Sequence, residues 1–402
     1  MNSRLKNKLS QNKEAWKDLF HIIGKELYNI FTDKGVLLVF IVACIVYPLV
    51  CGYIYNKEMM REMPIAIIDN SNSSLSRKYL RSIDATPEVR IEYKCSTLEE
   101  AKNLQKQAKV HGIVYIPNDF SHNINRGEQA NISVYNDMTS FFWYRNMAMS
   151  SNFTVQDMGK DIQVQRMVES GKNIEDAKRA SQPFKAIEHV LYNPGGYPSF
   201  ILPIVFILIL QQTLLIGIGM LAGTATERNQ LNTLFPRDAH YRGLLRIIFG
   251  RGIAFLITYI PIMVYMLIVV PKLFNLPHLV PNIGFIFLFI TPFLLSVIFL
   301  GMSISVFFKN RENSIPFYLF MSLPFVFLSG MSWPREAMPK FWELFSHIIP
   351  STNAIQGFTR MMTMNANMSQ VSIEYFTLWI LTAAYFIFTF ITYSWRMKKD
   401  LK

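Results

Sequence analysis

Residues 199 to 221 read SFILPIVFILILQQTLLIGIGML, a run without Lys, Arg, Asp or Glu. As a helix this run rises about 35 Å, more than the roughly 30 Å of hydrocarbon in a bilayer. Five further apolar runs also lack these four residue types, apart from Arg251; they span 35–55, 247–271, 279–308, 315–333 and 375–395. The sequence therefore predicts an α-helical polytopic membrane protein with six transmembrane helices.

Charge is concentrated beside these apolar runs. The chain is 51% hydrophobic and only 17% charged, against roughly 25% in an ordinary soluble domain. Its formal net charge is +12, but residues 56–197 hold 18 Lys/Arg against 17 Asp/Glu, and the rest of the chain holds 22 against 11. A basic surface spread over a soluble domain is thus excluded, and we expect no nucleic-acid partner.

The distribution of basic residues predicts the orientation. With the amino terminus inside, 18 of the 22 Lys/Arg outside the polar block are cytoplasmic, and only Lys272, Arg335, Lys340 and Arg360 lie in external loops. This asymmetry follows the positive-inside rule. We expect both termini in the cytoplasm and residues 56–197 outside.

The polar block, 56–197, is long enough to fold as a domain. Short β-type runs at 63–70, 89–93, 112–116 and 131–135 alternate with stretches of helical pattern. This alternation predicts an inserted extracytoplasmic α/β domain. Residues 139–189 have a helical and polar pattern, which we interpret as stalk helices that return to the membrane.

Two further segments have membrane-surface character. Residues 1–34 form the cytoplasmic amino-terminal segment, in which a helix is expected with apolar side chains on one stripe: Trp16, Leu19, Phe20, Ile23, Leu27, Ile30 and Phe31. This pattern is typical of a helix on the cytoplasmic leaflet, and packing on a soluble partner is the alternative. Within the permease core, 199–402, an apolar segment near 341–350 is too short to cross. We expect it to dip into the outer leaflet or lie on it.

The spans carry almost no ionisable residue. Arg251 is the exception, so we expect no buried ion pair and hence no ion-driven pump. The sequence has no Walker A loop, no His-x-x-x-His pair and no G-x-S-x-G elbow, so it offers no catalytic residue, metal site or bound cofactor. Gln211 and Gln212 are either an interhelical hydrogen-bond contact or part of a ligand path.

The segment after the second span, 224–236, reads TATERNQLNTLFP. It combines charge at Glu227 and Arg228 with apolar Leu231, Leu234 and Phe235 before a proline. A short helix with this apolar edge is suited to docking on another protein. A helix that merely lies at the membrane interface is the alternative.

In this order of parts the chain resembles the permease subunits of type-2 ABC exporters, in the subgroup with a large external domain between the first two spans. The matching segments are Lys25-Glu-Leu27, Ile65-Ala-Ile-Ile-Asp-Asn70 with Ser74-Leu-Ser-Arg77, Gly112-Ile-Val-Tyr-Ile-Pro-Asn-Asp-Phe120 with Arg126-Gly127, Tyr192-Asn-Pro194, Ser329-Gly-Met-Ser-Trp-Pro334, and Ile349-Pro350 with Gly357-Phe-Thr-Arg360.

The resemblance implies a permease in the bacterial inner membrane whose separate cytoplasmic ATPase subunit binds ATP and Mg. Its expected partners are that ATPase, a second permease (a copy or a paralogue), membrane lipids and a periplasmic adaptor or outer-membrane channel. The residues expected to couple to the ATPase are Trp16, Phe20, Glu227, Arg228, Leu231, Leu234 and Phe235.

The resemblance also points to the second and fifth spans as the substrate path, lined by Gln211, Gln212, Phe325 and Phe327. An apolar path implies efflux of an amphiphilic, lipid-like or drug-like cargo, because a hydrated cargo would lose its water without replacement partners.

Two other classes of function stay open. The chain is alternatively a non-transporting receptor or anchor, like phage-infection-type proteins, that presents its external domain. The additional uncharged spans weigh against this reading. A membrane enzyme would need a catalytic group that the sequence does not offer. A neighbouring gene for an ATPase with Walker motifs would discriminate between transport and reception.

Overall fold

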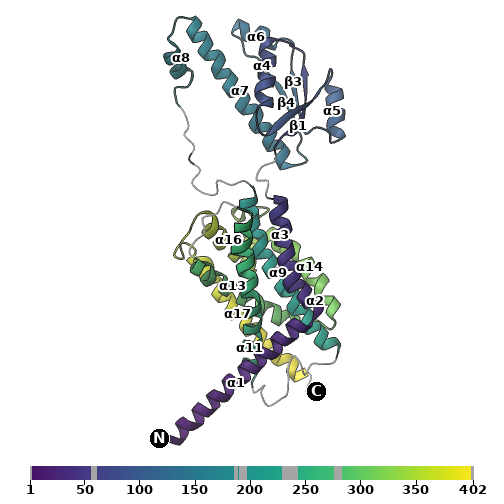
Figure 1. Cartoon of the computed structure of the whole chain (residues 1–402), viewed down its shortest axis with the longest axis vertical. Helices are drawn as coiled ribbons and strands as arrows, with labels where there is room; N and C mark the ends of the chain where they lie inside the picture. Colours follow the sequence, from purple (N-terminus) through teal and green to yellow (C-terminus); the bar gives the residue numbers. More distant parts are fainter. Residues whose placement is uncertain are drawn as a thin grey trace. The chain divides into compact units, whose positions relative to one another are not determined.

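The computed structural model describes residues 2–55, 61–184, 189, 197–228, 243–275 and 283–399 (Figure 1). The chain divides into two compact units. Residues 1–58 and 190–402 form a helical bundle, and residues 59–189 form a unit that contains the β-sheet.

The described helices of the bundle follow in the order α1 (Asn2–Thr32), α2 (Lys34–Leu37), a π-helical turn (Leu38–Ala43), α3 (Cys44–Tyr55), α9 (Tyr197–Glu227), α11 (Leu244–Val264), a second π-helical turn (Tyr265–Val269), α12 (Val270–Leu273), α13 (Ile283–Ser305), α14 (Arg311–Leu328), a 3-10 turn (Arg335–Ala337), α15 (Lys340–Ser346), α16 (Pro350–Thr363) and α17 (Ser372–Lys399).

Among the described residues, five helical segments are long and apolar enough to cross a membrane: Lys34–Tyr55, Phe200–Glu227, Leu244–Leu273, Ile283–Ser305 and Ser372–Lys398. They correspond to five of the six expected spans, and the chain is a polytopic helical membrane protein. The remaining expected span, 315–333, coincides in part with α14, which has 18 residues. Arg311 and Glu312 in its first turn lower its mean hydropathy, and it is not among these five segments.

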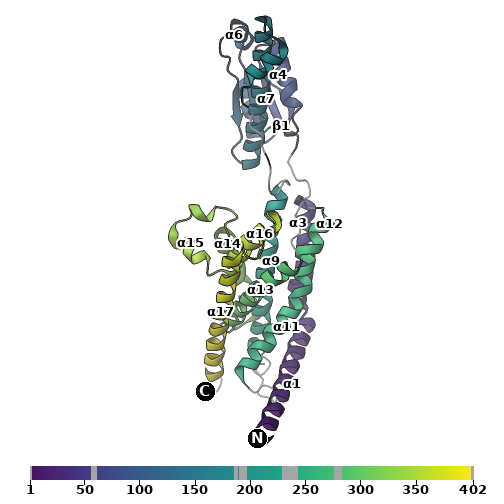
Figure 2. The same ribbon diagram turned by 90° about the vertical axis from the view of Figure 1, so that its left-hand side faces the viewer.

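Helix α9 is the centre of the bundle and packs against α3, α13, α14 and α16, while α13 and α17 run side by side (Figures 1 and 2). The first span and α17 are the least buried of the five segments. Since lipid and apolar side chains are alike in polarity, close packing rather than hydrophobicity selects these contacts.

Glycines allow α9 to approach its neighbours closely. A Cβ at Gly217 would lie 1.8 Å from the ring of Phe40, and a Cβ at Gly223 would lie 2.7 Å from the carbonyl oxygen of Asn310. Any larger residue at these two positions would push the first span or the start of α14 away. The glycine-rich end of α9 is therefore a packing feature.

The segment between α14 and α17 differs from expectation. The expected membrane-surface segment near 341–350 contains the short helix α15, whose Phe341 and Leu344 are exposed. It is followed by α16, a helix that the sequence analysis did not anticipate. Ser351, Thr352 and Asn353 at the start of α16 are at most 1% exposed. A polar run at a buried position leaves no hydropathy signal, although Pro350 at the first helical position is a typical helix start.

The second unit is built on a four-stranded sheet. Its elements are β1 (Met63–Asp69), α4 (Ser74–Asp84), β2 (Val89–Lys94), α5 (Leu98–Lys106), β3 (Gly112–Ile116), α6 (Phe120–Arg126), β4 (Ser133–Asn136), α7 (Phe141–Glu169) and α8 (Ile174–Ser181). The strand order is β2-β1-β3-β4, with β1 parallel to β2 and β3, and β4 antiparallel to β3. The four strands lie within a residue or two of the ranges that the sequence predicts.

Both faces of this sheet are covered. Ile65 and Ile67 of β1 pack with Tyr79 of α4 on one face, whereas Ala66 and Ile68 pack with α5 on the other. The chain moves from β1 to β2 and then back past β1 to β3. Two right-handed crossovers in opposite directions place their helices on opposite faces, as observed.

Helix α7 belongs largely to this sheet unit. Its Met147 and Met158 are buried in the same cluster as Ile65 and Tyr79. Within the stretch 139–189, where we expected stalk helices, this part of α7 thus packs against the sheet. Four polar residues of α7, Asn146, Ser150, Ser151 and Thr154, are buried beside these methionines.

Candidate functional site

The amino-terminal helix α1 packs along α11 through one mixed face. Asp18, Ile22, Glu26 and Ile30 recur every four residues, so they share a face of the helix, and none is more than 5% exposed. A Cβ at Gly250 of α11 would lie 2.6 Å from Ile22, which shows how closely the helices approach. This face differs from the apolar stripe that the sequence predicted, because it includes two carboxylates.

Three ion pairs join the amino-terminal segment to arginines at the beginnings of two bundle helices. Asp18 pairs with Arg246 at 2.7 Å, Glu26 with Arg251 at 2.8 Å, and Asp33 with Arg311 at 2.7 Å. The expectation that the bundle holds no buried ion pair is therefore wrong. The sequence showed Arg251 in the third apolar run. Its partner Glu26 lies more than 200 residues away, in a segment that the sequence assigned to the membrane surface.

The Glu26–Arg251 pair is the most deeply buried of the three. The Nε and Nη2 atoms of Arg251 both donate to Oε1 of Glu26, at 2.9 and 2.8 Å, and Nη1 donates to the Tyr393 hydroxyl at 2.8 Å. Arg251 thereby connects α1, α11 and α17. Removing one member of such a pair leaves a buried charge without compensation, at a cost of about 3–5 kcal/mol.

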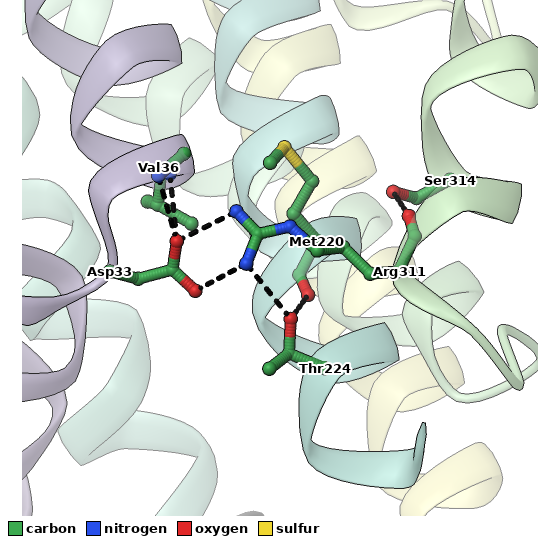
Figure 3. Close-up of polar contacts among 7 residues, drawn as sticks. Asp33, Val36, Met220, Thr224, Arg311 and Ser314 are labelled. Carbon is green, nitrogen blue, oxygen red and sulfur yellow. Dashed lines mark hydrogen bonds and ion pairs between the residues drawn. The ribbon is translucent and has the colours of Figure 1, made fainter. Parts of the chain in front are cut away.

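Asp33 links the start of the first span to α14 (Figure 3). Its Oδ1 accepts hydrogen bonds from the backbone N–H groups of Gly35 and Val36 at 3.0 and 3.1 Å, which caps the first span. The same carboxylate accepts hydrogen bonds from both Nη atoms of Arg311, at 2.7 and 2.8 Å. Nη1 also lies 3.4 Å from the Thr224 hydroxyl of α9.

The protonation of Asp33 responds to these bonds. Burial by itself would raise the pKa of Asp33, but the hydrogen bonds from Arg311 and the two backbone amides outweigh it and lower the pKa below the ordinary value. The carboxylate is therefore charged at neutral pH, as the ion pair requires.

A cavity of about 580 Å³ opens beside this ion pair. Its lining residues come from α1, the start of the first span and the end of α9, with one arginine each from α11 and α14: Glu26, Tyr28, Asn29, Thr32, Asp33, Lys34, Gly35, Leu221, Thr224, Ala225, Arg228, Arg251 and Arg311. Four of these side chains are cationic and two are anionic.

Of the residues expected to couple to an ATPase, the four described ones fall in two places. Trp16 and Phe20 are exposed on α1, at 61% and 66%, with ring centroids 6.2 Å apart. Glu227 lies at the end of α9, where its Oε2 accepts a hydrogen bond from the backbone N–H of Arg311, and Arg228 lines the cavity. About 18 Å of helix separates Trp16 from Tyr28, which lines the same cavity as Arg228. Leu231, Leu234 and Phe235 lie outside the described residues.

The residues expected along a substrate path are placed differently from one another. Gln211 is 1% exposed, and its Oε1 accepts a hydrogen bond from the backbone N–H of Ser351 at 2.9 Å. Gln212 donates to the carbonyl oxygen of Tyr318 in α14. Phe325 is half-buried against the core, and Phe327 is exposed. Both glutamines thus make the interhelical contacts that the sequence left as an alternative, and Gln211 lines no open surface.

A family model described as ABC-2 family transporter protein matches residues 34–391. The chain belongs to the ABC-2 transporter family. A search of curated proteins returned no match. The family is one of membrane-embedded permeases that work with ATPase subunits, in agreement with the resemblance found in the sequence. The matched region begins directly after Asp33, so α1 and its two buried carboxylates lie outside it.

Breaking the Asp33–Arg311 pair tests this description of the site. Asp33→Asn and Arg311→Gln should each lower the free energy of unfolding by about 1–3 kcal/mol, because each leaves a partly buried charge unpaired. The double variant should lose at least about 1 kcal/mol less free energy of unfolding than the two single variants lose together, since the two residues share one interaction. Unfolding of the full chain in detergent measures these costs, and Lys309→Gln, an exposed neighbour, should change stability by at most about 0.5 kcal/mol.

The same experiment has a defined pH dependence. A lowered pKa means that Asp33 stabilises the fold fully above its ordinary pKa and loses that contribution as the pH falls through the lowered value. The difference between wild type and Asp33→Asn should stay constant near neutral pH and shrink only in strong acid. Strictly additive costs, or a difference that already shrinks near neutral pH, would contradict the pairing.

Proposed function

We propose that this chain is the permease subunit of an ATP-driven exporter, powered by a separate ATPase subunit that binds ATP and Mg. Membership of the ABC-2 family over 34–391 carries this proposal. The 402 residues contain no Gly-x-x-x-x-Gly-Lys-Ser/Thr loop, and the proposal assigns a phosphate-binding motif of that type to the partner.

The proposed topology has six spans, with both termini in the cytoplasm and residues 56–197 outside. As the sixth span, α14 would supply about 27 Å of helix. Contacts at four helix ends support spans that alternate in direction. Glu227 at the end of α9 contacts Arg311 at the start of α14, and Arg311 pairs with Asp33. Arg246 at the start of α11 pairs with Asp18 of α1, and Tyr393 near the end of α17 bonds Arg251 of α11. This end also carries the excess of basic residues.

Side-specific labelling tests the topology. A reporter cysteine at Ser74, in a chain lacking Cys44, Cys51 and Cys95, should react with a membrane-impermeant maleimide in intact cells. A reporter at the exposed Lys17 should react only after the membrane is opened. The reverse pattern would show that the orientation is wrong.

We place the ATPase dock on α1 and the end of α9. Trp16 and Phe20 form an exposed aromatic pair on the side of α1 away from α11. Large aromatic side chains contribute most of the binding energy in many interfaces. The cation of Arg228 and the carboxylate of Glu227 would supply the polar rim.

Replacing the aromatic pair tests this dock. Trp16→Ser with Phe20→Ser should reduce co-purification of the ATPase roughly tenfold or more, since hot-spot aromatics contribute about 2 kcal/mol or more each. Tyr53→Ser with Phe341→Ser removes two equally exposed aromatics elsewhere on the bundle and should leave the complex intact. Equal yields from both double variants would reject the dock on α1.

We propose an amphiphilic, lipid-like or drug-like cargo that moves along α14, where a second permease would meet this chain. Phe320, Leu323 and Phe327 are at least 59% exposed on α14. Such an uncovered apolar face suits a partner helix or an apolar cargo and offers nothing to a hydrated one. Of the expected lining residues, Phe327 lies on this face. Phe325 lies on the opposite side of α14, packed against the core with Gln212 of α9 nearby, and Gln211 is too buried to belong to the path.

Cargo stimulation of the ATPase tests the path. In the reconstituted complex, hydrophobic amphiphiles should stimulate ATP hydrolysis, and Phe320→Ala with Phe327→Ala should weaken the response roughly fivefold or more through lost apolar contact. Phe376→Ala with Phe388→Ala, on the exposed side of α17, is the matched control. An unchanged response would move the path elsewhere, and export of a purely hydrophilic cargo would overturn it.

A further inference from the structure

The cavity beside Asp33 carries more positive than negative charge. The carboxylates of Asp33 and Glu26 are each engaged by an arginine of the lining, so these four charges cancel. Lys34 and Arg228 remain. Within the part of the chain that the structure describes, neither side chain forms an ion pair. Among the described lining residues, positive charges therefore outnumber negative charges by two.

The two remaining cations face the cavity from different helices. Lys34 is the first residue of the first span, and Arg228 follows the last turn of α9. Between them the lining offers the side-chain amide of Asn29 and the hydroxyls of Tyr28 and Thr32. Two cations with several neutral donors are the groups that bind a phosphate in proteins.

The surroundings of the cavity place it at the edge of the apolar bundle. Lys34 immediately precedes the apolar run of the first span. Tyr28 and Phe31, on the neighbouring turns of α1, are 69% and 52% exposed. Exposed aromatic residues beside basic residues are typical of the depth at which lipid headgroups lie.

We propose that this cavity binds the phosphate of an anionic lipid headgroup, held by Lys34 and Arg228. Its volume is within the range of small-molecule sites and accommodates a glycerophosphate group. The bound lipid would connect the first span with α9, next to the place where Asp33 and Arg311 connect the first span with α14. This inference does not depend on the cargo. It shares Arg228 with the proposed ATPase dock, and counting lipid on the purified chain without the ATPase separates the two roles.

Lipid retention by the purified full chain tests the site. The chain, in neutral detergent, is titrated with phosphatidylglycerol or phosphatidylcholine, and bound lipid is counted by native mass spectrometry. We expect preferential binding of phosphatidylglycerol, weakened roughly tenfold or more in Lys34→Gln with Arg228→Gln, since each cation contributes severalfold to anionic-lipid binding. Lys17→Gln with Lys398→Gln removes two exposed charges outside the cavity and should change binding less than about twofold.

A charge-retaining variant guards against misfolding as an explanation. Lys34→Arg with Arg228→Lys should keep the preference for phosphatidylglycerol. Equal binding of both lipids, or equal binding by the cavity and control variants, would overturn the proposal. Displacement of lipid by excess inorganic phosphate at constant ionic strength would assign the site to soluble phosphate and overturn the lipid as occupant. If Lys34→Gln with Arg228→Gln lost co-purification of the ATPase but kept its lipid binding, the two cations would bind an acidic side chain of the ATPase, and the lipid site would be overturned.

Discussion

The pairing of the amino-terminal carboxylates with bundle arginines is the constraint on which this end of the bundle depends. Arg246, Arg251 and Arg311 would each carry a charge against an apolar bundle, and each meets one carboxylate from the first 33 residues. A buried charge without a partner costs several kcal/mol. The position of α1 along α11 and the start of the first span are thereby determined, and with them the shape of the cavity.

Elsewhere in the bundle, neutral polar groups determine which helices meet. The Thr382 and Thr389 hydroxyls of α17 donate to the carbonyl oxygens of Pro292 and Phe299 in α13, at 2.9 and 2.8 Å. Gln211 accepts a hydrogen bond from the backbone N–H of Ser351 in α16, and Gln212 donates one to the carbonyl oxygen of Tyr318 in α14. Apolar packing has little directionality inside a membrane, so these bonds and the close contacts at small residues specify the arrangement.

The family region and the charge network overlap only in part. The matched region begins at Lys34, so Asp18 and Glu26 belong to a segment outside it, yet their arginine partners lie inside it. A segment beyond the family region is thus attached to the family core by charge. The same segment carries the exposed pair Trp16 and Phe20, on the side of α1 opposite the ion pairs.

The sequence by itself determined the periodic features of this protein. Five apolar runs became candidate spans, and the strands at 63–69 and 112–116 were predicted because alternation and apolar runs are local properties of the chain. The resemblance to ABC-2 permeases, confirmed by the family match, likewise rested on short segments in a fixed order. Of the candidate site, the sequence identified Arg228 but not the cavity around it.

Only the tertiary structure decided which face of each helix is buried and which charges meet. The stripe expected on α1 included Trp16 and Phe20, which are exposed, and omitted Asp18 and Glu26, which are buried. Helix α16 stayed hidden because its buried residues are polar. A helical period tells which side chains share a face, but the partner of that face lies hundreds of residues away. For Glu26 and Arg251, only the folded chain brings the two charges together.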